Sequence, residues 1–280
     1  MTSGNVMPKT ETCNELLSLF SKLNRTERAW VLYDEMFGLK IKSSVCTFNI
    51  MINVLCKEGK LNKAKEFLGF MEILGTKPTV VTYNTIIHGF CLRGRVGGAQ
   101  MIFGAMKGRG VQPDSYTYGL LISGMCKERR LDEASGLFDK MLEIGLLPSA
   151  VTYNTLIDGY CNKGDLDRAF GYRDEMVKKG IMPTVSTYNL LIHGLFMEGR
   201  ASEADCMVRE MEEKGMVPDA ITYNILINGS AQVPSSLAYC DLDSEINHLW
   251  YTHFVARKIF IGGLTKNTTL GSWRIAASEV

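Results

Sequence analysis

The chain has 280 residues, of which 46% are hydrophobic, so it has enough apolar material for a core and is not expected to be disordered. Its 31 Lys and Arg residues offset 30 Asp and Glu residues, and a net charge of +1 gives no global basic field of the kind that attracts nucleic acid. No run of about 18 uncharged apolar residues is present, so we expect neither a membrane-spanning helix nor a membrane partner.

The cysteine positions indicate a repeat rather than a disulfide scaffold. Cys56, Cys91, Cys126 and Cys161 follow one another at intervals of 35 residues, and these are four of the eight cysteines. There is no CxxC pair and no cluster of Cys and His at zinc spacing, so we predict no metal and no cofactor. A cysteine at a fixed helix position is better interpreted as a small core residue in a reducing compartment.

The same interval of 35 residues recurs in four further columns. A Thr-Tyr-Asn triplet or a near relative begins at Thr47, Thr82, Thr117, Thr152, Thr187 and Thr222. Proline recurs at Pro8, Pro78, Pro113, Pro148, Pro183 and Pro218, and alanine at Ala29, Ala64, Ala99, Ala134, Ala169 and Ala204. Methionine recurs at Met36, Met71, Met106, Met141, Met176 and Met211. These columns predict six complete repeats, units 1 to 6, at residues 10–44, 45–79, 80–114, 115–149, 150–184 and 185–219.

Each unit is predicted to contain two helices. Between Val151 and Asn162, apolar residues recur at spacings of three and four, which indicates an amphipathic helix that ends at Gly164. A second amphipathic stretch, as in Leu131 to Met141, ends at a glycine and a proline. The alanine column marks a close approach of two helices, and the methionine column fills the gap behind it. One hairpin cannot bury its apolar face, so we predict an all-α fold in which hairpins stack into an α-solenoid.

The ends of the chain depart from the repeat. Residues 1–9 are predicted to be an N-terminal extension without a clear transit peptide, so Met1 need not be the natural start of a full precursor. A partial seventh unit at 220–230 loses the pattern at Ser230-Ala231, inside a helix. We expect the non-repeat tail at 231–280 to be disordered or a makeshift cap, as in a truncated or alternatively spliced product.

The unit at 151–184 resembles a P-class pentatricopeptide repeat, and the resemblance covers residues 10–230. The tetratricopeptide alternative has 34 residues and a Trp-containing pattern that is absent here. The resemblance implies a right-handed superhelix that binds single-stranded RNA, one base per repeat. It also implies location in plant mitochondria, or alternatively chloroplasts, and a role in transcript processing, stabilisation, splicing or translation.

The fifth residue of each unit is the candidate for base recognition. A side chain amide carries both a donor and an acceptor and can therefore pair with the Watson–Crick edge of a base once per repeat. The fifth-position asparagines are Asn14, Asn49, Asn84, Asn154, Asn189 and Asn224. The alternative interpretation is that this asparagine only helps to cap the first helix.

The resemblance implies that the fifth residue acts together with the last residue of the same unit. The resulting pairs are Asn14 with Ser44 for cytidine, Asn84 with Asp114 and Asn189 with Asp219 for uridine, Asn49 with Thr79 and Asn154 with Thr184 for either pyrimidine, and Gly119 with Ser149 for any base. The expected target is a pyrimidine-rich single strand, 5′-C-Y-U-N-Y-U-3′. Asn224 would add a further pyrimidine if the partial unit folds.

Two more columns are assigned by the same resemblance. The second residue of each unit would sandwich the base, and the candidates are Val81, Val151 and Ile221, with Tyr116 able to stack on a base instead. Lysine at the thirteenth position would contact phosphate, as Lys22, Lys57 and Lys127. The sixteenth position is basic in five of six units, which predicts a basic stripe despite the low net charge: Arg25, Lys60, Arg95, Arg130 and Arg200. The alternative is a solvated turn that favours basic residues near helix ends.

No catalytic constellation is found, so we predict a binding protein without a small-molecule substrate, rather than an enzyme. His88 and His193 share a position that varies between units, and the tail histidines have neither an HxE nor a following CxxC. Two alternatives stay open, a solenoid that scaffolds protein partners and a truncated paralogue with little function. Arg173, at a position that is apolar in other units, predicts local core damage in unit 5.

Overall fold

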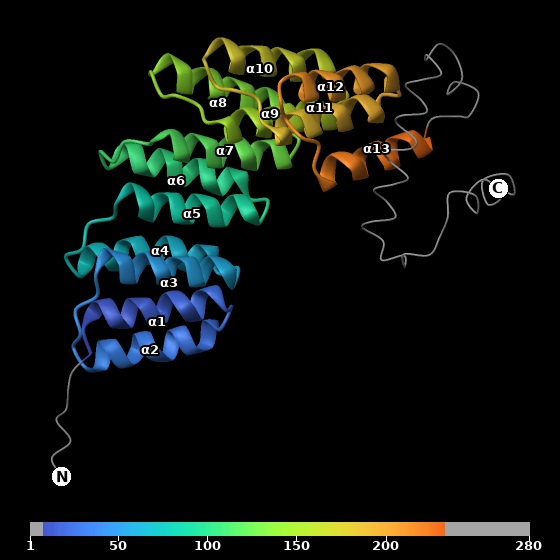
Figure 1. The fold of residues 1–280 in the computed structure, drawn as a ribbon. Coiled ribbons are helices and arrows are strands. Elements are labelled where there is room, and N and C mark those ends of the chain that lie inside the picture. The colour runs from blue at the N-terminus through green and yellow to red at the C-terminus, as the bar shows by residue number, and fades with distance from the viewer. Residues whose placement is uncertain (1–7, 233–280) are drawn as a thin grey trace, which may run out of the picture. The chain divides into compact units, whose positions relative to one another are not determined.

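The structure is a computed structural model that describes residues 8–232, and within this range it contains thirteen α-helices and no strand (Figure 1). The helices are α1 (Thr10–Lys22), α2 (Thr26–Gly38), α3 (Val45–Lys57), α4 (Leu61–Ile73), α5 (Val80–Leu92), α6 (Val96–Gly108), α7 (Ser115–Lys127), α8 (Leu131–Glu143), α9 (Ala150–Lys163), α10 (Leu166–Lys178), α11 (Val185–Met197), α12 (Ala201–Glu213) and α13 (Ala220–Gln232). The predicted all-α fold class is confirmed.

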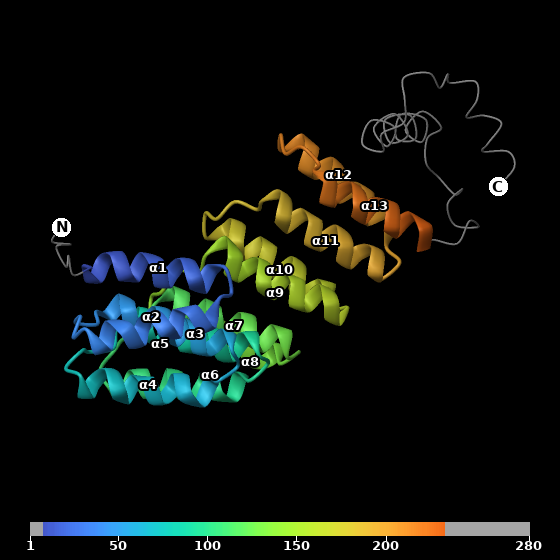
Figure 2. The ribbon, with the colours of Figure 1, turned by 90° about the horizontal axis from the view of Figure 1, so that it is seen from below.

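The helices form hairpins that stack in chain order. From α1 to α11, each odd-numbered helix packs against the even-numbered helix that follows it, and consecutive odd-numbered helices of this range pack against one another in a continuous row (Figure 1). Figure 2 shows the same order from below, with α11 beside α9. Each hairpin therefore buries its apolar face against its neighbours, as expected of an α-solenoid. The hand of the superhelix stays a prediction.

Four of the odd-numbered helices, α3, α5, α7 and α11, begin at capping boxes, which explains the threonine column of the sequence. Ser44 is the N-cap of α3: its hydroxyl accepts a hydrogen bond from the Thr47 backbone N–H at 3.3 Å, and its own N–H donates to Thr47 Oγ1 at 3.0 Å. Reciprocal bonds of this kind satisfy donors that a helix N-terminus leaves unpaired. Equivalent boxes start α5, α7 and α11. The last residue of each unit is thus the cap of the next hairpin.

The predicted glycine turns are confirmed. Gly164 ends α9 with φ of 80°, in the left-handed region that residues with a Cβ resist. Glycines with positive φ also follow α3, α5 and α11, whereas Asn24 and Arg129 take this conformation after α1 and α7. Of these, asparagine tolerates the left-handed region better than most residues.

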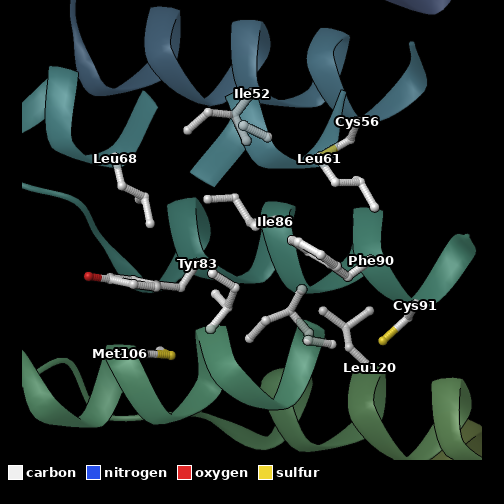
Figure 3. Close-up of a cluster of buried hydrophobic side chains, with 14 of the residues drawn as sticks. Ile52, Cys56, Leu61, Leu68, Tyr83, Ile86, Phe90, Cys91, Met106 and Leu120 are labelled. Carbon is white, nitrogen blue, oxygen red and sulfur yellow. The ribbon is translucent and has the colours of Figure 1, made fainter. Parts of the chain in front are cut away.

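The core follows the predicted columns. Every side chain of the alanine and methionine columns is buried, and the aromatic residue of the Thr-Tyr-Asn triplet is buried with them from Phe48 to Tyr188 and half-buried at Tyr223. Figure 3 shows Ile52, Tyr83, Ile86 and Leu120 filling the space between successive helices. No helix within residues 8–232 is long and apolar enough to cross a membrane.

A glycine in α5, α7, α11 and α13 faces the first helix of the preceding unit at very short range, and Gly159 of α9 faces Leu131 of α8. A Cβ placed on Gly89 would lie 2.3 Å from Cys56 Sγ, and one on Gly124 would lie 2.6 Å from Cys91 Sγ. Gly194 and Cys161 repeat the arrangement at 2.7 Å. The cysteine column and the glycine column therefore set the distance between consecutive first helices. Burial raises the pKa of Cys56 and Cys161 to about 12, so these thiols are inert core groups, as predicted.

The core damage expected at Arg173 stays a prediction: its Nε is buried without a hydrogen-bond partner, although its charge is paired. Its guanidinium on α10 forms ion pairs with Asp174 at 2.7 Å and with Glu210 of α12 at 3.4 Å. A carboxylate from the next hairpin therefore compensates the charge. The expectations for residues 1–9 and 231–280 fall almost entirely outside the described residues, although α13 continues past Ser230 to Gln232.

We expect Gly124→Ala to lower the stability of the fold by about 1–3 kcal/mol, because its Cβ would overlap Cys91 Sγ and lie 3.1 Å from Val96 Cγ2. Gly136→Ala in α8, where a Cβ would meet nothing within 4 Å, is the control and should stabilise by about 0.5–1 kcal/mol. Urea unfolding followed by circular dichroism measures both. Equal effects of the two substitutions would contradict the close approach of α5 and α7.

Candidate nucleic-acid interface

In units 1, 3 and 6 the structure brings together the two residues that the sequence paired. The fifth residue lies on the first helix of a unit, and the last residue caps the first helix of the next unit. Because consecutive first helices pack side by side, the two residues meet although they are 30 positions apart in the chain.

Units 3 and 6 share the same hydrogen-bonded group. Asn84 Nδ2 donates to Asp114 Oδ1 at 3.3 Å, and its Oδ1 accepts from Thr117 Oγ1 at 2.7 Å. In unit 6, Asn189 Nδ2 donates to Asp219 Oδ1 at 3.2 Å, and its Oδ1 accepts from Thr222 Oγ1 at 2.7 Å. Both asparagines are 5% exposed. The amide is thus held at both ends by the capping box of the following helix.

Unit 1 holds its amide at both ends with a serine in place of the aspartate, whereas unit 5 holds only the amide oxygen. In unit 1, Asn14 Nδ2 donates to Ser44 Oγ at 3.1 Å and its Oδ1 accepts from Thr47 Oγ1 at 2.6 Å. In unit 5, Asn154 Oδ1 accepts from Thr187 Oγ1 at 2.8 Å.

In units 2 and 4 no threonine hydroxyl donates a hydrogen bond to an asparagine oxygen. Asn49 Oδ1 is buried without a hydrogen-bond partner. Gly119 of unit 4 has no side chain, and a Cβ there would lie 3.5 Å from Thr152 Oγ1. Within residues 8–232 the six units therefore differ in how firmly an amide is oriented.

The interpretation of these asparagines as caps of their own helix was wrong. The N-cap positions of α3, α5, α7, α9 and α11 belong to Ser44, Thr79, Asp114, Ser149 and Thr184. The asparagines lie within the first helices and bond to the capping box of the next one.

The aspartates of the paired units are held in their ionised form. Burial raises the pKa of Asp114, but hydrogen bonds from the Thr117 backbone and hydroxyl and from Asn84 outweigh it and leave the pKa below its usual value. For Asp219, the Thr222 backbone N–H is the main cause of a lowered pKa. In both residues these bonds fall on Oδ1.

The predicted base-sandwiching residues lie in the first turn of the same helices and are exposed. Val81 and Ile221 are each 60% exposed, Tyr116 is 62% exposed and Val151 is 74% exposed. Covering large exposed apolar side chains with an apolar or aromatic surface, such as the face of a base, lowers the free energy. The sequence prediction of their role is untested, but their exposure fits it.

The predicted phosphate contacts lie at the opposite end of the first helix. Position 13 is about 12 Å along the helix axis from position 5, at 1.5 Å per residue. Lys22 and Lys127 are exposed there, whereas Lys57 Nζ donates to the Ser21 backbone carbonyl at 2.5 Å. Lys57 therefore already satisfies a carbonyl at the C-terminus of α1.

The basic stripe at position 16 is weaker than predicted, because three of its members are paired within the protein. Lys60 lies 2.8 Å from Glu58, Arg130 lies 2.7 Å from Glu133, and Arg200 lies 2.6 Å from Glu203. A carboxylate at this distance offsets the charge that would attract phosphate.

Two signals were missed by the sequence reasoning. The threonine of the repeated triplet served there only as a marker of the period, although its hydroxyl contacts the amide of the preceding unit. Charge also divides along the chain: residues 45–114 carry nine Lys and Arg against four Asp and Glu, whereas residues 185–219 carry three against seven. Counting charge per unit would have found this division.

The PPR repeat family model matches six overlapping segments, at residues 8–57, 43–92, 78–127, 120–159, 148–197 and 183–232. The chain belongs to the PPR repeat family. Its uninterrupted 35-residue units are those of a plant P-class pentatricopeptide repeat protein, so the predicted family is confirmed.

The PPR chain is similar to two curated proteins of Arabidopsis thaliana over short segments. A mitochondrial pentatricopeptide repeat-containing protein is 60% identical over 51 residues, which are 18% of this chain and 8% of that protein. A second pentatricopeptide repeat-containing protein is 42% identical over 57 residues, which are 20% of this chain and 5% of that protein. The chain thus matches only a small part of the length of these relatives.

Solved PPR structures share the fold. The crystal structure of PPR10 from maize matches with a TM-score of 0.62 and 29% identity, over 93% of this chain and 35% of that chain. PPR10 in complex with an 18-nucleotide psaJ RNA element matches with a TM-score of 0.58 and 24% identity, over 95% of this chain and 40% of that chain.

We expect the loss of stability caused by Asp114→Asn to depend on pH, because the substitution removes the charge of the capping carboxylate. A lowered folded-state pKa means that the stabilising charge is present above the unfolded-state pKa and is lost as pH falls through the folded-state value. Asparagine is itself a good cap, so the variant should be less stable by only about 0.5 kcal/mol at pH 6. In urea unfolding at pH 6 and pH 3 the difference should shrink with acid. A difference independent of pH would contradict an ionised Asp114.

Proposed function

We propose that the chain is a sequence-selective binder of single-stranded RNA that contacts one base per repeat. The observation that carries this proposal is the asparagine amide joined to a capping Asp or Ser of the next helix in units 1, 3 and 6. This group recurs at one place in the repeat, beside exposed apolar side chains such as Val81. Single-stranded bases need such a polar group and a stacking surface at a regular pitch.

The chemistry of the group favours pyrimidines. Uracil offers an N3–H between two carbonyl oxygens, so a carboxylate can accept from N3–H while the amide N–H donates to a carbonyl. Asp114 and Asp219 keep Oδ2 for such a contact, since their bonds to the protein fall on Oδ1. Cytosine has an acceptor at N3 instead, and the Ser44 hydroxyl can donate to it. The proposed target is therefore 5′-C-Y-U-N-Y-U-3′.

We propose that the protein works by occupying a transcript in a plant organelle, without catalysis of its own. PPR10 has been solved with an RNA element, and one relative is named as mitochondrial, which supports RNA as the partner and the mitochondrion as the location. Chloroplast location is the alternative. Protection of a site, splicing, processing and translation are all compatible with occupation, together with protein partners of organelle RNA processing.

A protein-interaction solenoid is the second candidate, and one surface favours it. Leu147, Met182 and Val217 occupy the same position in units 4 to 6 and are 78%, 69% and 71% exposed. Unit 6 is also strongly acidic, which repels phosphate. Contiguous exposed apolar patches mark protein-interaction sites, and this column would supply one if its side chains join across the units.

Binding to a labelled 5′-CUUAUU-3′ strand and to an all-purine strand of equal length tests the first proposal. The pyrimidine strand should bind more tightly at both about 50 and about 200 mM salt, with weaker binding at the higher concentration. Since a good base contact discriminates by about 1–3 kcal/mol, Asn84→Ala with Asn189→Ala should lose about tenfold or more of that preference. Asn62→Ala, on the surface of α4, is the control. No binding by a folded, helical sample would contradict the proposal and favour the scaffold.

Unit 4 offers a gain-of-function prediction. Gly119→Asn combined with Ser149→Asp would place the pair of units 3 and 6 in unit 4, and a Cβ at Gly119 has room because its neighbour lies 3.5 Å away. The fourth nucleotide, which should be free in the wild type, is then expected to prefer uridine by about tenfold. Gly119→Ala with Ser149→Asp is the control that lacks the amide. Equal affinity for all four bases in the double variant would contradict the one-base-per-repeat arrangement.

A further inference from the structure

From α3 to α13, each first helix carries a buried threonine at its third unit position, and four of these hydroxyls are used twice: those of Thr47, Thr117, Thr187 and Thr222. Thr187 Oγ1 accepts a hydrogen bond from the backbone N–H of its N-cap, Thr184, at 3.0 Å. The same hydroxyl donates to Asn154 Oδ1 of the preceding unit at 2.8 Å. The bond to an asparagine recurs at 2.6 Å from Thr47, at 2.7 Å from Thr117 and at 2.7 Å from Thr222.

This donation sets the direction of the amide. A primary amide can turn by half a rotation and exchange the places of its oxygen and nitrogen, which changes an acceptor into a donor at the same point. When the threonine hydroxyl accepts a hydrogen bond from the N–H of the N-cap residue, its own proton is free to be donated to another group. In these units the acceptor is the asparagine Oδ1. The amide oxygen is then held towards the threonine, and the NH2 group is directed away from it.

We propose that this threonine is a positioning residue, which orients the base-recognising asparagine of the preceding unit and so determines whether that unit discriminates between bases. The inference rests on the base recognition proposed above. It concerns a residue that touches no base itself, and it assigns selectivity to a contact between units.

The units then rank by their hydrogen bonds to the amide. Units 1, 3 and 6 hold it through both the threonine and the last residue. Unit 5 holds its carbonyl through Thr187, while Thr184 pairs with Thr187 rather than with Asn154. In unit 2 the Asn49 oxygen has no partner, and Thr82 pairs with Thr79. Selectivity should fall in that order, and unit 4 should have none.

Unit 5 is the most informative place for a test, because Thr187 is the group that orients Asn154 there. Thr187→Val keeps the shape of the side chain but removes both the bond to Asn154 and the cap. Thr152→Val removes the equivalent threonine at a site where the preceding unit has Gly119 and therefore no amide. Both variants remove a hydroxyl that pairs with the side chain of the N-cap residue, Thr184 or Ser149, and only Thr187→Val loses an asparagine contact.

The experiment measures the affinity of the full chain for four RNAs that differ only at the fifth nucleotide of 5′-CUUANU-3′. The wild type should prefer a pyrimidine there by about tenfold. Thr187→Val should reduce this ratio to about twofold or less, with the preferences at nucleotides three and six unchanged, because one net hydrogen bond is worth about tenfold at most. Thr187→Ser, which keeps the hydroxyl, should restore the wild-type ratio. Thr152→Val should leave the ratio at every nucleotide unchanged.

Three results would overturn the inference. If Thr187→Val keeps the wild-type preference for a pyrimidine at the fifth nucleotide, the amide needs no threonine to orient it, and base recognition itself stands. An equal loss of selectivity in Thr152→Val assigns the effect to the helix cap. A wild type without any base preference overturns the base recognition together with this inference.

Folding of the variants is checked independently by circular dichroism. If Thr187→Val does not fold, Gly119→Asn with and without Thr152→Val makes the same comparison in unit 4. The hydroxyl should then be required for a preference at the fourth nucleotide, and a preference that survives Thr152→Val overturns the inference.

Discussion

The short distance between consecutive first helices is the constraint on which the rest of the structure depends. Glycine on one helix faces cysteine on the helix before it so closely that a single added carbon would overlap the sulfur, as at Gly89 and Cys56. Only at this separation can a side chain of one helix bond to the N-cap of the next, as Asn84 does with Asp114 at 3.3 Å. The packing of the core and the geometry of the candidate site are therefore one arrangement.

The capping box serves two purposes in this arrangement. Asp114 accepts from the Thr117 backbone N–H at 2.8 Å and so starts α7, while the same oxygen accepts from Asn84. A residue that must cap a helix is confined to Ser, Thr, Asp and Asn, and these types differ in charge and in donor capacity. The residue types that cap a helix well therefore also differ in how they can bond to the edge of a base. The last residue of a unit can thus change between these types without loss of the fold.

Much of the fold could be predicted because each local sequence signal recurs every 35 residues, so a signal that is weak in one unit is supported by the same signal in the others. These signals are the helix periodicity, the glycine turns and the buried alanine and methionine columns. The pairing of Asn14 with Ser44 or Asn84 with Asp114 was also predicted, through the family resemblance. The double use of Thr117 was not, because its bond to Asn84 spans 33 residues and looks like a simple cap in the sequence. The ion pair of Arg173 with Glu210 escaped for the same reason, because its partner lies 37 residues along the chain. The ion pair of Arg130 with Glu133 is local, but it depends on side-chain direction.

The central claim is that successive units contact successive bases in order, and photo-crosslinking tests it most directly. A 4-thiouridine is placed at the third or the sixth nucleotide of 5′-CUUAUU-3′, and the crosslinked peptide is identified by mass spectrometry. We expect crosslinks near the second residues of the flanking units, which are Val81 and Tyr116 for the third nucleotide and Ser186 and Ile221 for the sixth. The same peptides at both positions, or peptides in the reverse order, would contradict it.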